Sequence, residues 1–400
     1  MATGTDQLTA LLADRLPDMV ALRRRLHRRP EIGLDLPETQ AVVLEALGGL
    51  DLAIRTGSGC SSIVADLDGD RPGPTVLLRA DMDALPMPED TGLDHASEIP
   101  GAMHACGHDA HTAMLVAAAA HLCAERDRIA GRVRFMFQPG EEGYDGASVM
   151  IDEGVLDGVE AAFAIHITPN LPAGWVMTRP GPLMASADEF VITVRGRGGH
   201  ASTPHFTADP VPVACEIVGA LQAAVTRRVD AFAPAVVTVA TIEAGTTTNV
   251  IPETATMAGT IRTVSESTRK AVVEDLRRVA TGIAAAHGQV AEVTIEAGYP
   301  VTVNTPSMAE LVMEVAPAVA TGRRVLEAPS PTMGAEDWSR VLARVPGSMA
   351  FLGVCPPEIP DARQAPACHS NRMQLHEEAM SVGAALHVAM AHALLEGRGR

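Results

Sequence analysis

Residues 75–83, "TVLLRADMD", join a short apolar run to two aspartates, and this stretch sets the expectation for the fold. An apolar run without polar alternation is typical of a strand that is buried on both faces of a parallel sheet. Comparable runs recur at 132–137 ("RVRFMF") and 161–167 ("AAFAIHI"), and helical patterns separate them. The alternation of buried strands with helices predicts an α/β fold in which helices cover both faces of the sheet.

The pattern changes between residues 186 and 297. There a strand, a helix, two strands, a helix and a last strand follow one another, which is the β-α-β-β-α-β order of a compact ferredoxin-like unit. Helical patterns and a strand at 348–354 ("SMAFLGV") resume beyond it. We therefore expect one α/β domain formed by residues 1–185 and 298–400, with a ferredoxin-like domain of residues 186–297 inserted into it.

The composition limits the partners and the compartment. The chain has 400 residues with 31 basic and 49 acidic side chains, a formal net charge of −18, which disfavours nucleic acid and anionic membranes as partners. The first 20 residues lack the basic start and apolar core of a secretory signal, and no uncharged apolar run approaches the roughly eighteen residues that span a bilayer. Six sparse cysteines fit reduced thiols. These features predict a cytoplasmic protein.

Polar side chains follow the expected strands at the points where the strands end. Ligands of open α/β sheets bind outside the carboxyl ends of the strands, so these side chains are expected at one rim. Carboxylates, imidazoles and thiols that converge there would repel one another or stay unsatisfied without cations, and they are ligands that divalent metals accept. Their number predicts a site for two metal ions. The candidates are Asp81, Asp83, Glu141, Glu142, His166, Cys368 and His369.

The stretch "MHACGHDAHTAM", residues 103–114, belongs to the same rim because it precedes a helical pattern. His104 and His108 are four apart, as two ligands on one helical face would be, whereas Cys106 and His108 are two apart, as ligands on an extended loop would be. A helix that begins near Asp109, after Gly107, favours the pair Cys106 and His108. His104 and His111 are then loop and helix residues that line the site.

Each candidate also has a simpler interpretation. Adjacent glutamates are often a solvated loop, an Asp-x-Asp sequence can form a turn and a helix cap, and a histidine in an apolar run is usually a core residue. The meeting of four such segments at strand ends favours the metal site. In the insertion, His200, Asn249 and Arg262 are weaker candidates, since a hinge or a cross-strand pair explains them equally well.

Taken together, the motifs resemble those of the metal-dependent amidohydrolases that include hippurate hydrolase, the indole-acetyl-amino-acid hydrolases and related N-acyl-amino-acid amidohydrolases, within the aminoacylase and carboxypeptidase superfamily. The resemblance implies a metallo-exopeptidase-like α/β catalytic domain, with the inserted domain as a lid and dimerisation domain. The motifs that carry it are, in chain order, "LRRRLHRRPEIG", "LRADMDALPM", "MHACGHDAHTAM", "FQPGEEG", "GGHASTPH", "TTTNVIPE", "GTIRT" and "MGAEDWS".

The resemblance implies an enzyme that cleaves N-acyl amino acids, carrying acetyl, benzoyl or other aryl-acyl groups, to a carboxylic acid and a free amino acid. Glu141 would be the catalytic carboxylate, and Asp83 the aspartate that orients a ligand. His200 would be the transition-state histidine of the inserted domain, and Asn249 and Arg262 would hold the substrate's carboxylate and its surroundings. The implied metal ligands are Cys106, His108, Glu142, His166 and His369.

The resemblance further implies two divalent cations per subunit, from among zinc, manganese, nickel and cobalt, and a homodimer that forms through the inserted domain. One departure lies near the C-terminus. Relatives commonly follow the last ligand with a proline and an aromatic residue, where this chain has Asn371 and Met373. The departure bears on the acyl pocket, so an N-acetyl-diaminopimelate-type deacetylase or a dipeptidase remains an alternative.

Two hypotheses of other kinds make distinct demands on the sequence. A non-catalytic binding protein on the same fold predicts the loss of Glu141 or of a ligand, and all of these residues are present. A cysteine nucleophile at Cys106 would need a stable thiolate, which the surrounding acidic residues disfavour unless a metal compensates them. The sequence therefore favours the metal-dependent hydrolase with a small-molecule substrate.

Overall fold

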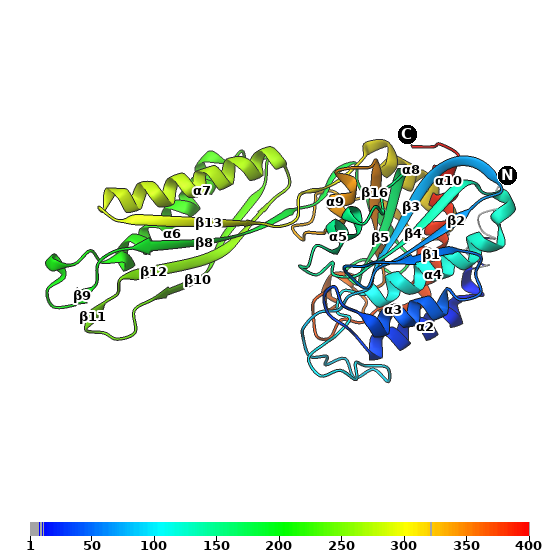
Figure 1. Ribbon diagram of the computed structural model, residues 1–400, viewed down its shortest axis with the longest axis horizontal. Coiled ribbons are helices and arrows are strands. Elements are labelled where there is room, and N and C mark those ends of the chain that lie inside the picture. Colours follow the sequence, from blue (N-terminus) through cyan, green and yellow to red (C-terminus); the bar gives the residue numbers. More distant parts are fainter. Residues whose placement is uncertain (1–7, 9, 11, 321, 400) are drawn as a thin grey trace. The chain divides into compact units, whose positions relative to one another are not determined.

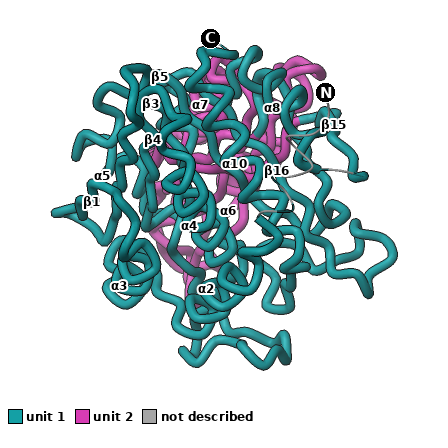
Figure 2. Tube along the Cα trace, turned by 90° about the vertical axis from the view of Figure 1, so that its right-hand side faces the viewer, with its two compact units in different colours: residues 1–183, 303–330, 337–400 teal, residues 184–302, 331–336 magenta. Residues whose placement is uncertain are grey.

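The computed structural model describes residues 8, 10, 12–320 and 322–399. The other residues of the N-terminal stretch, where a secretory signal was not expected, lie outside the described residues. The chain divides into two compact units, unit 1 of residues 1–183, 303–330 and 337–400, and unit 2 of residues 184–302 and 331–336 (Figure 2). Compared with the predicted insertion, unit 2 begins two residues earlier, ends five residues later, and also takes in residues 331–336.

Unit 1 contains an eight-stranded sheet in the order β1-β2-β4-β3-β5-β16-β6-β15 (Figure 1). At its centre β3 pairs in parallel with β4 and β5, and β16 pairs in parallel with β5. The predicted buried parallel strands are confirmed here, while β1 and β2 add an antiparallel edge. The strands are β1 (Ala53–Thr56), β2 (Ile63–Asp68), β3 (Arg71–Asp81), β4 (Ala130–Gln138), β5 (Val159–Thr168), β6 (Val176–Thr178), β15 (Val325–Glu327) and β16 (Gly347–Gly353).

Side chains of β3 alternate between two covered faces. Leu78 and Ala80 join the hydrophobic core that includes helices α4 and α10, whereas Arg79 between them lies 6.0 Å from the ring of Trp338 in helix α9. β3 is therefore buried on both faces, as its apolar run without polar alternation predicted. The helices are α2 (Leu16–Arg28), α3 (Pro37–Ala46), α4 (His108–Ala124), α5 (Gly146–Asp152), α8 (Pro306–Val319), α9 (Trp338–Leu342) and α10 (Met380–Leu395).

Helix α10 belongs to the interior of unit 1. The segment Glu377–Leu395 is long and apolar enough to cross a membrane by length and composition, yet 78% of its apolar window is buried inside the structure. A helix that is apolar on all sides is expected in a protein core. The segment is therefore a core helix, which packs against α4 and α8.

The N-terminus of α4 is held by an ion-pair network with α2. The Nε of Arg23 donates to Asp109 at 2.7 Å, and the Nδ1 of His27 lies 2.7 Å from the same carboxylate oxygen. Burial by itself would raise the pKa of Asp109, but Arg23 and His27 lower it well below its usual value. The motif "LRRRLHRRPEIG" therefore supplies the partners that a buried carboxylate in "MHACGHDAHTAM" needs.

Unit 2 has the predicted β-α-β-β-α-β order. Its sheet runs β10-β12-β8-β13 with antiparallel pairs, and its two helices pack on one face, where Phe190 and Ile192 meet Ile217 and Leu276. Its elements are β8 (Ser186–Arg195), β9 (Gly199–His200), α6 (Pro210–Arg228), β10 (Ala235–Ala244), β11 (Val250–Ile251), β12 (Thr254–Thr263), α7 (Glu266–Ala286) and β13 (Val290–Ala297), and the chain passes between the units in β7 (Gly181–Met184) and β14 (Thr302–Asn304).

Gly107, directly before α4, has a backbone conformation and a close contact that both favour glycine. Its φ is +84°, and a Cβ at this position would lie 2.6 Å from Cγ1 of Ile167. Gly49 has a similar φ of +81° but open space around the same point, so it provides a matched control. We expect Gly49→Ala to lower the free energy of unfolding by about 1 kcal/mol through backbone strain alone. Gly107→Ala should lower it by about 2–4 kcal/mol because strain and overpacking add.

Denaturant unfolding of both variants measures this difference. Equal losses for the two alanine variants would show that Ile167 moves aside freely and that the contact with Gly107 does not constrain the start of α4.

Candidate metal centre and active site

The five residues predicted as metal ligands come from four segments at the carboxyl end of the unit 1 sheet. Cys106 precedes α4, and His108 is the first residue of that helix, not a residue of the loop before it as we expected. Glu142 lies in the loop after β4, His166 near the end of β5, and His369 in the loop that follows β16. This placement follows from parallel strands, whose carboxyl ends share one edge.

The side-chain ligand atoms lie close enough to share cations. Sγ of Cys106 is 3.4 Å from Nε2 of His166, and Nε2 of His369 is 3.1 Å from Oε1 of Glu142. Among the described residues, five groups of three potential ligand atoms are present, with the atoms of each group within 4.8 Å of one another, and three of these groups overlap pairwise at Cys106, His108 and Glu142. Overlapping groups fit two neighbouring cations better than a single one. These three groups are Cys106 with His108 and His166, Cys106 with Glu142 and His369, and His108 with Glu141 and Glu142; the other two are Asp81 with His108 and His111, and Glu141 with Glu336 and Asp337.

Asp83 links two of the ligands. Its Oδ1 lies 3.3 Å from Nδ1 of His108, and its Oδ2 accepts a 2.9 Å hydrogen bond from the backbone N–H of Glu142. The first contact directs Nε2 of His108 into the site, where it has no hydrogen-bond partner among the described residues. A buried imidazole nitrogen left without a partner in this position is what a ligand nitrogen requires, so the residues fit a metal ion.

The neighbouring His111 and His104 differ in their hydrogen bonding. Nδ1 of His111 lies 2.6 Å from Oδ1 of Asp81, and its Nε2 accepts a 2.8 Å hydrogen bond from the backbone N–H of Ile167. Both ring nitrogens of His111 are therefore occupied by structural contacts. His104 is buried, and burial lowers its pKa to about 3, which keeps it neutral. Among the described residues neither of its ring nitrogens has a hydrogen-bond partner.

Without a metal, the site retains protons. Burial by itself would lower the pKa of His108, but Asp81, Asp83 and Glu142 raise it to about 10. The thiol of Cys106 has a raised pKa, first because of its contact with Cys368, then because of burial and the nearby glutamates. Acidic surroundings thus oppose a free thiolate, which argues against a cysteine nucleophile and for a thiolate that a cation stabilises.

Sequence reasoning missed the residues that hold the site from behind. Arg79, fully buried, donates to Asp81 at 2.5 Å and to Oδ1 of Asp337 at 3.1 Å. Asp81 was a candidate ligand, yet it binds Arg79 and His111 and lies 3.6 Å from Nε2 of His108. The signal for such a network was an arginine inside an apolar strand, since a buried guanidinium needs partners.

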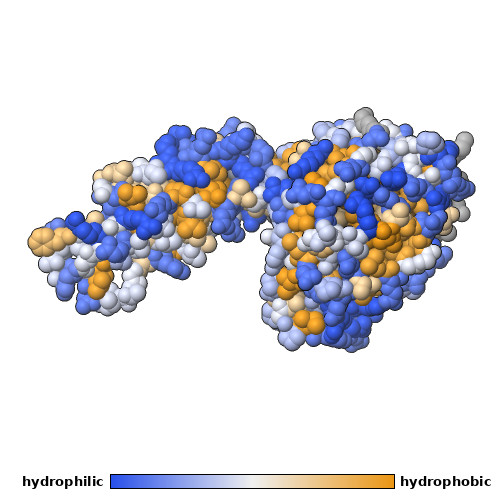
Figure 3. All heavy atoms as spheres, viewed as in Figure 1, coloured by the Kyte–Doolittle hydropathy of each residue, from blue (hydrophilic) through white to orange (hydrophobic). Residues whose placement is uncertain are grey.

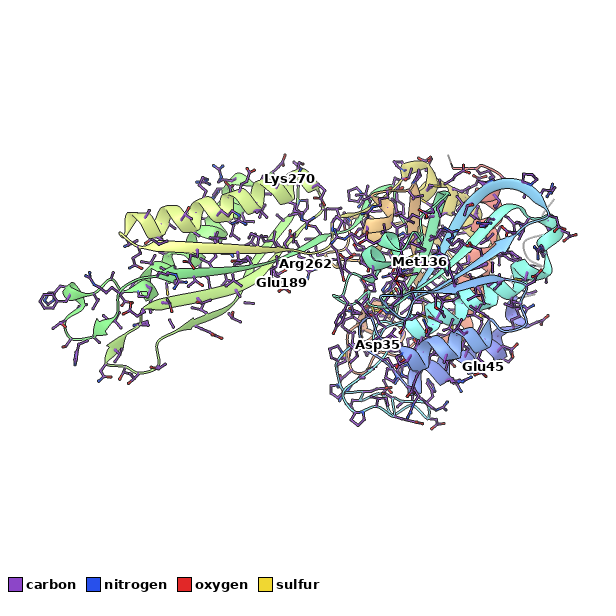
Figure 4. All side chains as sticks on the ribbon, viewed as in Figure 1. Asp35, Glu45, Met136, Glu189, Arg262 and Lys270 are labelled. Carbon is purple, nitrogen blue, oxygen red and sulfur yellow. The ribbon has the colours of Figure 1, made fainter. Side chains whose placement is uncertain are left out.

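The candidates of unit 2 fall into two separate places. His200 pairs with Val250 across β9 and β11, and the backbone carbonyl of Asn249 accepts from the N–H of Ala201, so His200 and Asn249 are neighbours. Arg262 lies in β12, where it pairs with Ala187, and Figure 4 labels it close to Glu189. At about 3.4 Å per residue, the eight residue steps from Thr254 put Arg262 about 27 Å from the other end of β12, beyond which β9 and β11 lie (Figure 1).

The sheet, the imidazoles, the thiol and the carboxylates define a metal-dependent hydrolase that holds two divalent cations. The profile of peptidase family M20/M25/M40 matches residues 77–393. Thermostable carboxypeptidase 1 of Saccharolobus solfataricus is 39% identical over 94% of each chain, and N-acetylcysteine deacetylase of Bacillus subtilis is 37% identical over 94% of this chain and 97% of the relative. The chain therefore belongs to peptidase family M20/M25/M40.

A solved structure supports both the fold and the metal content. A Bacillus subtilis protein, described as a dinuclear metal binding peptidase from the M20 family, superposes with a TM-score of 0.83 at 34% identity, over 97% of this chain and 99% of that one. The predictions of an amidohydrolase and of two divalent metal ions are confirmed. The role of each predicted site residue stays a prediction.

Metal affinity should depend steeply on pH. His108 and Cys106 both hold protons at neutral pH in the metal-free protein, because their pKa values are raised, and a metal must displace those protons. Affinity should therefore rise with pH below about 10, by about tenfold per pH unit for each displaced proton. Zinc titration against a competing chelator at pH 6, 7 and 8 measures this slope. Cys106→Ser should reduce it to about one proton, and an affinity independent of pH would contradict the assignment of these ligands.

Proposed function

We propose that the protein removes the acyl group from small N-acyl amino acids and that Glu141 is its catalytic carboxylate. The observation that carries the proposal is the position of Glu141. Glu141 is 5% exposed, its carboxylate lies within 4.8 Å of ligand atoms of His108 and Glu142, and five other residues are the predicted ligands. A carboxylate beside the metals that is not one of their ligands can accept and deliver a proton.

Divalent cations bound here supply a water of lowered pKa and polarise the amide carbonyl. Glu141 accepts the proton of the attacking water and delivers it to the leaving amine, so that the amide C–N bond breaks and a carboxylic acid and an amine are released. Asp83 keeps His108 and the backbone of Glu142 in place during this exchange through its two hydrogen bonds. The proton is conserved, and the carboxylate of Glu141 is regenerated.

The relatives support a small N-acyl amino acid as the substrate. The N-acetylcysteine deacetylase among the relatives supports a small acyl group on an amino acid, whereas the carboxypeptidase supports the alternative of a peptide bond. Met373 is 1% exposed and belongs to the hydrophobic core, 3.9 Å from the point where a Cβ on Gly107 would lie. Met373 therefore packs in the core beside the start of α4.

A homodimer through unit 2 is part of the proposal. His200 and Asn249 are about 27 Å or more from Arg262 along β12, which exceeds the length of a small N-acyl amino acid. If all three residues contact one substrate, they must come from two copies of unit 2. Edge strand β10 and the inner strand β8 also expose apolar side chains, and Figure 3 shows apolar residues at the surface of unit 2. These exposed residues include Val191, Val236 and Ile242.

The cytoplasm is the proposed compartment. All six cysteines are free thiols, which suits a reducing environment. The net charge of −18 supports a small molecule, and neither nucleic acid nor an anionic membrane, as the partner.

Glu141→Gln separates catalysis from metal binding. The variant should bind two metal ions per subunit and lose turnover by roughly 10²- to 10⁴-fold, because its amide accepts no proton. Glu142→Gln provides the matched comparison and should lose metal as well as activity, because it removes a ligand. Metal content by atomic emission and kcat on the best substrate measure both effects. Turnover retained by Glu141→Gln would refute its role.

A substrate panel tests the function itself. Metal-loaded and chelated protein should be assayed on N-acetyl, N-benzoyl and indole-acetyl amino acids and on dipeptides. We expect hydrolysis of N-acyl amino acids that chelation abolishes. Preference for dipeptides would favour the alternative, and activity that survives chelation would overturn the metal-dependent mechanism.

A further inference from the structure

The motif "MGAEDWS", residues 333–339, contains a carboxylate that no step of the proposed reaction uses. Asp337 stands directly before helix α9 and is fully buried. Its carboxylate accepts hydrogen bonds from Nε2 of Gln138 at 2.7 and 2.8 Å and from the backbone N–H of Ala147 at 2.9 Å. Gln138 ends β4 and Ala147 stands in the first turn of α5, so one side chain binds both ends of the loop 139–146.

A second contact from α9 reaches the same loop. Arg340 donates to the two carboxylate oxygens of Asp145 at 3.2 and 2.9 Å. Asp145 has a φ of +53°, a left-handed conformation that costs energy for a residue other than glycine, and it is the N-cap of α5. Arg340 therefore holds the loop at its most strained point.

The loop held in this way carries Glu141 and Glu142. Inside it, the N–H of Gly143 donates to the carbonyl of Glu141 at 2.7 Å and the N–H of Gly146 donates to the carbonyl of Gly140 at 3.0 Å. These short internal bonds fold the loop back on itself. Because its ends are tied to one carboxylate, the loop has little freedom to change the position of the two glutamates.

The charge of Asp337 is partly compensated by Arg79, which Asp337 shares with Asp81. Arg79 donates to Asp337 and to Asp81, and the ring of Trp338 lies 6.0 Å from its guanidinium carbon. A buried ion pair with this many hydrogen bonds fixes geometry better than an exposed pair, and breaking it leaves a buried charge unpaired. The network therefore favours one position of α9 relative to β3 and β4.

We propose that Asp337 and Arg340 are positioning residues, which hold the loop 139–146 so that Glu141 is set for proton transfer and Glu142 for metal ligation. The inference rests on the proposed function for the part of Glu141 and goes beyond it by assigning a task to α9. Neither residue is assigned a catalytic step: Arg340 acts through Asp145, and Asp337 acts through the two ends of the loop and lies with a carboxylate oxygen within 4.8 Å of one of Glu141.

The test compares two variants with two controls of similar environment. Asp337→Asn removes the buried charge that ties the loop, and its control Asp66→Asn removes the carboxylate partner of Arg134, a largely buried pair of β2 and β4 away from the site. Arg340→Gln weakens the second contact, and its control Arg132→Gln removes an exposed pair with Asp68 and a 3.7 Å contact with Asp66. The controls measure what the loss of an ion pair does to stability alone.

Two readouts separate positioning from stability. The first is kcat and KM of the metal-loaded enzymes, and the second is the visible absorption of the Co(II)-substituted proteins, whose bands depend on ligand geometry. We expect Asp337→Asn to lower kcat by roughly 10- to 100-fold with KM within threefold, and to shift the Co(II) bands, because Glu142 moves with the loop. Arg340→Gln should fold normally and lower kcat by roughly three- to tenfold. Both controls should keep kcat within twofold and their Co(II) bands unchanged.

The outcomes are distinct from those of the proposed function. If the wild-type protein cleaved no N-acyl amino acid, the proposed function would fail, while the Co(II) comparison would still decide whether α9 positions the loop. Unchanged Co(II) bands in both α9 variants, or a loss of kcat no larger than in the matched controls, would overturn the inference. Where Asp337→Asn does not fold, Arg340→Gln alone decides, because its ion pair is partly exposed.

Discussion

Arg79 carries a buried charge in the central strand of the unit 1 sheet. The polar side chains at the carboxyl end of that sheet are positioned by the hydrogen bonds that neutralise this charge. A guanidinium without partners costs several kcal/mol in such a place, so Asp81 and Asp337 must stay beside it. Each partner then has a second contact that points to the active site. Asp81 contacts His111, which accepts from Ile167 next to a metal ligand, and Asp337 ties both ends of the loop that carries two glutamates.

The same constraint explains the electrostatics of the metal centre. Burial lowers the pKa of His108, but the carboxylates around it raise it by more, and the contact with Cys368, burial and the nearby glutamates raise the pKa of Cys106. The metal-free site therefore holds protons, and within the described part of the chain Nε2 of His108 has no hydrogen-bond partner. Divalent cations replace those protons and satisfy the carboxylates together, so metal binding and deprotonation of the ligands are one event.

Much of this arrangement could be predicted from the sequence, because unbroken apolar strands fix the edge at which their following residues meet. The strands of unit 1, the order of elements in unit 2 and the ligand segments all follow from local patterns. The start of α4 was misjudged by one residue, because Gly107 itself serves as a left-handed N-cap. The distance between Arg262 and His200 could not be predicted, since it depends on which strands pair and where β12 ends.

The sequence by itself determined the chemistry: which residue types carry thiol, imidazole and carboxylate groups, and at which strand ends they stand. Only the tertiary structure decided which of those groups form structural ion pairs and which orient the predicted metal ligands. Asp81 and Asp83 are two residues apart and look alike in the sequence, yet one neutralises Arg79 while the other orients His108. The role of Asp81 depends on Asp337, some 250 residues away in the chain, because both carboxylates pair with Arg79. The partners of a buried charge are set by tertiary packing, and a local sequence pattern does not show which residues these partners are.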